Sequence, residues 1–148
     1  MNCKKSYDKS LKKNIHLCFD KYIFLVSYQI LEKFILDELN KLSKATGYSI
    51  KNLAIEFKDN SKNSTLAYFS REGDKPIGFC FYLGKFDYMS PNKIIDICRH
   101  EFAHFMVCMQ NSGNHPKEPH GTKWKNICYS LGAIPSAHMN NVFTKHLV

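Results

Sequence analysis

The hydrophobic positions of this 148-residue chain first form a helical pattern. Residues 20–45 carry apolar side chains at three- and four-residue spacing, which gathers them on one face of a helix. This face consists of Leu31, Phe34, Ile35, Leu39 and Leu42. Gly47 stands where a helix C-cap is expected, because glycine adopts the left-handed conformation without strain. The pattern therefore predicts a long N-terminal helix.

Three short strands are predicted after this helix. Leu53, Ile55 and Phe57 alternate with more polar neighbours, which is typical of a half-buried strand. Turn-rich segments separate this strand from a second at 65–70 and a third at 77–83. The third strand is apolar on both faces, so we expect it to be covered on both sides. Strands joined by short turns indicate a small three-stranded antiparallel sheet.

Two further helices are expected in the second half of the chain. Ser90 is a favourable N-cap and Pro91 is favoured at the first helical position, which predicts a helix from 90 to about 110. The apolar spacing predicts a third helix over about 122–131, and Gly132 ends it. Helices and a small antiparallel sheet together predict an α+β fold.

Composition and charge narrow the class of protein. Hydrophobic residues make up 44% of the chain and charged residues 23%, which indicates a globular protein rather than a disordered or coiled-coil one. Because no internal repeat or linker divides it, we expect one compact domain over 20–148 behind a basic N-terminal arm at 1–19. The net charge of +8 favours acidic partners such as nucleic acid, although lysine, the weaker phosphate ligand, supplies nearly all of it.

No membrane span or export signal is expected. The most apolar stretch, at 22–36, is interrupted by polar residues and is shorter than the about 20 residues that a span needs. The first 21 residues are polar and rich in lysine, unlike a secretory signal. The six cysteines include no C-x-x-C pair, so we expect reduced thiols and no zinc ribbon. These features predict a cytoplasmic protein.

The motif that carries chemistry is His100-Glu101-Phe102-Ala103-His104, an H-E-x-x-H sequence inside the predicted second helix. Positions i and i+4 lie on one helix face, so both imidazoles can reach a single metal ion. Glu101 is rotated by about 100° from this pair, where it can flank the metal and act as base for a water. Zinc suits such a site, because it accepts imidazole nitrogen and lowers the pKa of bound water to about 7. The mostly apolar neighbours favour a buried metal site over two surface histidines.

A third ligand must come from elsewhere in the chain, since a catalytic zinc usually has three protein ligands. The residues of suitable type are His115, Glu118, His120, His138, His146, Cys108 and Cys128. His120 is placed best, because it stands at the entry of the third helix, where a ligand is held more rigidly than in mid-loop. Cys108 and Cys128 fit better as small core residues. His115 and Glu118 fit better as exposed loop residues.

The combined motifs resemble the SprT-like metallopeptidase family, which includes the Spartan-type proteases that cleave proteins crosslinked to DNA. The similarity consists of the H-E-x-x-H motif, a gap of about fifteen residues, His120-Gly121-Thr122-Lys123-Trp124-Lys125 and then Leu131-Gly132-Ala133. The likeness is clear over 90–143 and looser over the preceding helix and strands.

This resemblance implies a compact zincin-like α+β domain that hydrolyses peptide bonds, in some members in a DNA-dependent manner. The three zinc ligands of the family match His100, His104 and His120. Its catalytic glutamate matches Glu101, the general base for a zinc-activated water. The expected cofactor is Zn²⁺, and the expected substrate is a protein or peptide, including proteins associated with DNA.

Three other interpretations stay open. In the first, zinc stabilises a non-enzymatic module whose lysines bind nucleic acid, although a structural site has no need of Glu101. In the second, a zincin scaffold hydrolyses a non-protein amide, since fold does not fix function. The third is a metal-free domain that binds a partner. For the peptidase, His138 and Tyr129 are considered as second oxyanion donors, and the third strand as a cleft wall whose free edge pairs with an extended peptide.

Overall fold

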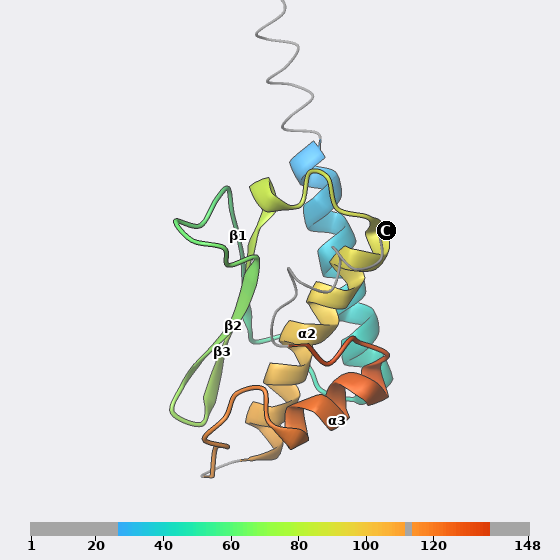
Figure 1. The fold of residues 1–148 in the computed structure, drawn as a ribbon. Helices are drawn as coiled ribbons and strands as arrows, with labels where there is room; N and C mark the ends of the chain where they lie inside the picture. Colours follow the sequence, from blue (N-terminus) through green and yellow to red (C-terminus); the bar gives the residue numbers. More distant parts are fainter. Residues whose placement is uncertain (1–26, 112–113, 137–148) are drawn as a thin grey trace, which may run out of the picture.

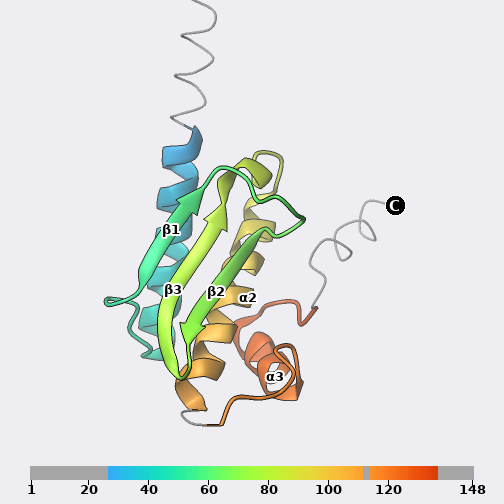
Figure 2. The same ribbon diagram turned by 90° about the vertical axis from the view of Figure 1, so that its left-hand side faces the viewer.

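A computed structural model describes residues 27–111 and 114–136 of the chain. The predicted basic N-terminal arm and the start of the predicted first helix lie outside these residues. Within them the secondary structure is α+β, with three α-helices and a three-stranded sheet. The helix at 27–46 and α2 (Pro91–Gln110) cover one face of the sheet, while α3 (Thr122–Leu131) packs against α2 (Figures 1 and 2).

α2 begins at its predicted N-cap, and the other two helices end at the glycines predicted as their C-caps. The Ser90 hydroxyl accepts a hydrogen bond from the Lys93 backbone N–H, and Pro91 occupies the first turn of α2. Gly47 follows the helix at 27–46 with a φ of +78°, and Gly132 follows α3 with a φ of +70°. Among the described residues, no helix combines the length and the apolar character needed to cross a membrane.

The sheet is mixed, so the prediction of an antiparallel sheet was wrong. Its strands are β1 (Ala54–Lys58), β2 (Ala67–Glu72) and β3 (Lys75–Tyr82), in the order β1-β3-β2. β3 pairs antiparallel with β2 across a tight turn but parallel with β1. The connection at 59–66 leads from β1 to β2 and leaves the place of one strand between them. β3 occupies this place. This central place suits β3, because it is the strand whose two faces are both apolar.

An aromatic cluster fixes the distance between the sheet and α2. The ring of Phe79 on β3 lies 5.5 Å from that of Phe69 on β2, measured between centroids. It also lies 6.4 Å from Phe102 and 6.0 Å from Phe105, both on α2. These large side chains are buried or partly buried and close-packed, so they hold β2 at a defined spacing from α2.

Gly78 permits β1 to approach β3 closely. A Cβ atom at this position would lie 2.0 Å from the carbonyl oxygen of Ala54. We expect Gly78→Ala to displace β1 and to lower the free energy of unfolding by about 2–3 kcal/mol, as overpacking does. Urea unfolding measures this loss. Glu56→Ala, an exposed change on the neighbouring strand β1, should stay within about 0.5 kcal/mol of the parent protein. An equal loss in both variants would contradict the explanation.

Candidate metal centre

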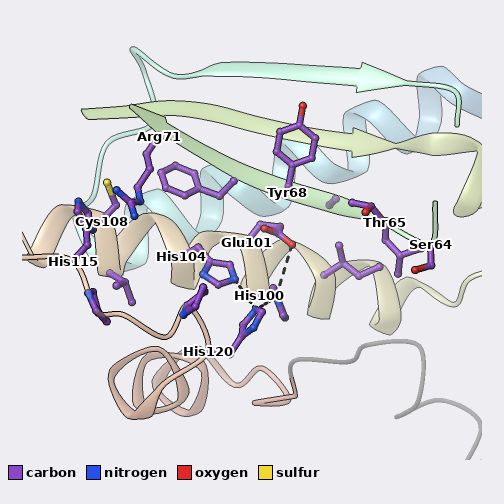
Figure 3. A pocket seen from close by; sticks show the side chains of 17 residues that line it. Ser64, Thr65, Tyr68, Arg71, His100, Glu101, His104, Cys108, His115 and His120 are labelled. Carbon is purple, nitrogen blue, oxygen red and sulfur yellow. Dashed lines mark hydrogen bonds and ion pairs between the residues drawn. The ribbon is translucent and has the colours of Figure 1, made fainter. Parts of the chain in front are cut away.

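Three histidines meet where α2 contacts the entry to α3. His100 and His104 lie one turn apart on α2, and His120 comes just before α3. The Nε2 atom of His120 lies 3.0 Å from Nε2 of His104 and 3.3 Å from Nε2 of His100. One ligand atom from each residue lies within 4.8 Å of the other two. The structure therefore brings the three sequence-predicted ligands together (Figure 3).

The chemistry and spacing of these nitrogens fit a metal ion. Nitrogen atoms bound to a tetrahedral zinc at about 2.0–2.1 Å lie roughly 3.3–3.4 Å from each other, close to the two separations above. Burial, reinforced by the neighbouring histidines, lowers the pKa of His100 to about 3. Burial likewise lowers the pKa of His104 to about 4. Both imidazoles are therefore neutral at neutral pH, which is the state that binds a metal.

Trp124 packs against all three imidazoles. Its ring centroid lies 4.7 Å from that of His100, 5.4 Å from that of His104 and 4.6 Å from that of His120. The indole Nε1–H donates to the backbone carbonyl of His100 at 3.4 Å, and the side chain is buried. A fixed ring in this position restricts the rotation of the imidazoles. The sequence placed Trp124 in the predicted third helix and in the SprT-like motif, and its four-residue spacing from His120 is the signal that could have indicated this contact.

Glu101 lies beside the three histidines but is not one of the converging ligand groups. Its Oε1 atom is 3.9 Å from Nε2 of His100, and the carboxyl accepts a hydrogen bond from the backbone N–H of Phe69 on β2. The residue is buried, with 6% of its surface exposed. Burial raises the pKa of Glu101 to about 8, against the opposing effect of the Phe69 hydrogen bond. A carboxyl with this pKa can both hold and release a proton near neutral pH.

A cleft of about 610 Å³ lies between α2 and β2, and the three histidines and Glu101 are among the residues that line it (Figure 3). Its other walls come from the loop before β2, from β2 itself and from the loop before α3. The prediction that the third strand supplies a free edge here was wrong. β3 is paired on both sides, so the edge strand beside the cleft is β2.

The free edge of β2 presents its backbone groups toward this cleft. The N–H of Tyr82 donates to the carbonyl of Leu66, so alternate residues from Leu66 onward direct their backbone groups at β3. The backbone groups of Ala67 and Phe69 consequently point away from β3. The Phe69 N–H reaches Glu101, which agrees with this direction.

The other residues considered as ligands lie apart from the three histidines. Cys108 and Cys128 are buried thiols, and burial raises the pKa of Cys128 to about 12, so it stays protonated. The sulfur of Cys108 donates to the backbone carbonyl of Asp74. His115 places Nε2 2.6 Å from Oδ1 of Asp74. Glu118 is exposed on the loop before α3.

Of the two residues considered as oxyanion donors, one lies within the described residues. Tyr129 is 69% exposed on α3 and does not line the cleft. His138 lies outside the described residues, as does His146. Conversely, Tyr68 and Arg71 of β2 line the cleft and were not anticipated. Their place there depends on the strand order, which local sequence patterns do not give.

The geometry of the site therefore carries the functional interpretation, together with the motifs of the sequence. No protein-family model, no curated protein and no solved structure matches the chain.

Proposed function

We propose that this protein is a zinc-dependent peptidase with a SprT-like, zincin-type domain. The observation that carries the proposal is the convergence of three imidazoles beside a buried carboxyl in an open cleft. Structural zinc sites are closed by four protein ligands, whereas catalytic sites have three and leave one position open. A structural site would also have no use for Glu101.

The zinc ligands in this proposal are His100, His104 and His120. A bound zinc supplies Lewis-acid chemistry, because it lowers the pKa of a water and polarises a carbonyl group. Glu101 moves the proton: its carboxylate takes a proton from the attacking water and passes it to the nitrogen of the leaving amine. A zinc ion bound by the three histidines would lower the pKa of Glu101 from about 8 toward neutral pH, because a nearby positive charge favours the carboxylate. A pKa near the working pH suits both taking the proton from water and giving it to the amine.

The free edge of β2 favours an extended peptide as the substrate. Ala67 offers a backbone N–H and carbonyl to such a chain, and Phe69 offers its carbonyl. A peptide that pairs here lies alongside the histidines, whereas a small non-protein amide has no need of a strand edge. Proteins associated with nucleic acid are the substrate class that both the SprT-like motifs and the net charge of +8 favour.

Hydrolysis by the zinc-loaded protein tests this function. We expect it to bind about one zinc per chain and to cleave an unfolded protein into new peptides that mass spectrometry identifies. A chelator should stop the cleavage and added zinc should restore it. Bound zinc without cleavage, both with and without single-stranded DNA, would contradict the peptidase and favour a non-enzymatic zinc-stabilised module.

A further inference from the structure

We propose that Arg71 forms a specificity subsite for an acidic side chain of the substrate, an inference that rests on the proposed peptidase function. The cleft has two chemically different ends (Figure 3). Ser64 and Thr65 lie at one end, and Arg71 lies with Cys108 and His115 at the other. The histidines and Glu101 lie between these ends.

The guanidinium of Arg71 carries a positive charge that no described acidic side chain neutralises by an ion pair. Its Nη1 donates to the carbonyl of Gly73 at 2.6 Å, which anchors the side chain to the turn between β2 and β3. Within the described part of the chain, Arg71 makes no ion pair. Arginine presents five N–H donors in a planar fork that matches a carboxylate, so most of the fork is available to a ligand.

The two acidic residues that follow Arg71 within three positions, Glu72 and Asp74, form no ion pair with it in the described part of the chain. Asp74 holds its Oδ1 atom 2.6 Å from Nε2 of His115, and it does not line the cleft. The thiol of Cys108, at the same end, is kept protonated because burial raises its pKa. The charge that faces a ligand at this end is therefore that of Arg71.

The strand geometry gives the register of the subsite. Arg71 follows Phe69 by two residues, so both side chains lie on the same face of β2. The ring of Phe69 packs on Phe105 of α2, and Arg71 lines the cleft beside α2. Two residues of extended strand span about 7 Å, and Phe69 is the residue whose N–H contacts Glu101. A peptide that pairs antiparallel with β2, with the residue after the cleaved bond opposite Phe69, brings to Arg71 the second residue before that bond. Between Ser70 and Arg71 the pairing of β2 with β3 shifts by one residue, and it then continues to Glu72.

Paired peptides test the subsite. A peptide cleaved by the zinc-loaded protein is prepared with Glu or Gln at each of the three residues before the scissile bond. We expect a three- to tenfold higher kcat/KM for Glu at the second position, about the effect of one charge-assisted contact at a partly exposed site. In Arg71→Gln the ratio of the two rates should fall to about one. Arg71→Lys should keep part of it, because the charge remains and the fork is lost.

Lys75→Gln is the matched control, since it removes a positive charge from the same hairpin at a residue that does not line the cleft. Its Glu-to-Gln ratio should equal that of the parent protein. Equal rates for both peptides in the parent, or an unchanged ratio in Arg71→Gln, would overturn the subsite and leave the peptidase standing. Circular dichroism establishes that each variant is folded.

Failure of the peptidase itself gives a different result, because then no peptide is cleaved. In that case the binding of fluorescently labelled peptides to zinc-loaded Glu101→Gln, followed by anisotropy, decides the subsite. The subsite is supported if Glu101→Gln binds the Glu peptide more tightly than the Gln peptide and the double variant with Arg71→Gln binds both equally. Equal binding of the Glu and Gln peptides overturns it.

Discussion

Glu101→Gln is expected to lower peptide hydrolysis by about 10²–10⁴-fold, the usual contribution of a general base, while zinc stays bound. The amide has the shape of the carboxyl but cannot take a proton from water. Zinc should remain because the closer carboxyl oxygen is 3.9 Å from Nε2 of His100 and is not one of the three convergent donors. The kcat/KM for a peptide and the zinc content by mass spectrometry, on the same sample, measure the two effects.

The fold should tolerate this change. The Phe69 N–H can donate to an amide oxygen as it does to the carboxyl, and a neutral side chain avoids the cost of burying a charge. Glu118→Gln is the matched control, since it makes the same chemical change at an exposed residue outside the cleft and should keep parental activity. Near-parental hydrolysis by Glu101→Gln would show that another group takes the proton.

His120→Ala is expected to weaken zinc binding by more than about 100-fold. Loss of a residue that merely orients a ligand already costs 10–100-fold in metal affinity, and this change removes one of three donors. The effect should be a loss of affinity rather than of structure, because Trp124 still packs on His100 and His104. Competition against a chelating zinc dye gives the dissociation constant of each variant.

His115→Ala provides the comparison for this measurement. His115 also stands in the loop before α3 and lines the same cleft, but its Nε2 atom is paired with Asp74 rather than with the other histidines. We therefore expect His115→Ala to bind zinc with the parental affinity. If His115→Ala loses zinc and His120→Ala keeps it, the third ligand has been assigned to the wrong residue.

Local sequence signals were sufficient for the helices and for two of the site histidines. The caps at Gly47, Ser90 and Gly132 act on backbone groups within a few residues, so neighbours in sequence determine them. The four-residue spacing of His100 and His104 likewise fixes both on one helix face. None of these features depends on the rest of the fold.

The order of the strands could not be obtained in this way. The turn-rich segment between the second and third predicted strands correctly indicated a short turn, and β2 and β3 form a hairpin there with Gly73 at a φ of +58°. The connection at 59–66 has no comparable signal, because its residues permit either a return beside β1 or a passage past it. The choice depends on which strand best fills the buried centre, a property of the whole sheet. The wrong strand order then moved the predicted free edge from β2 to β3.

The assignment of His120 depends partly on local sequence signals and partly on tertiary packing. Its place at the entry of a helix made it the preferred third ligand, and the SprT-like motif indicated the same residue. Its convergence with His104 nevertheless depends on how α3 packs on α2, which Trp124 determines from within the core. The sequence could therefore identify His120 and include Trp124 in its motif, but not the contact of the indole ring with all three imidazoles.

The division of the three histidines between α2 and the segment that enters α3 also has a kinetic consequence. α3 has ten residues, too few to be stable alone in water, and it is held by the buried side chains of Trp124, Ile127 and Cys128. Transient opening of this short unit withdraws His120 from the two histidines of α2. The residence time of a metal here would therefore follow the local unfolding rate of α3, and hydrogen exchange of its amides would slow when the metal is bound.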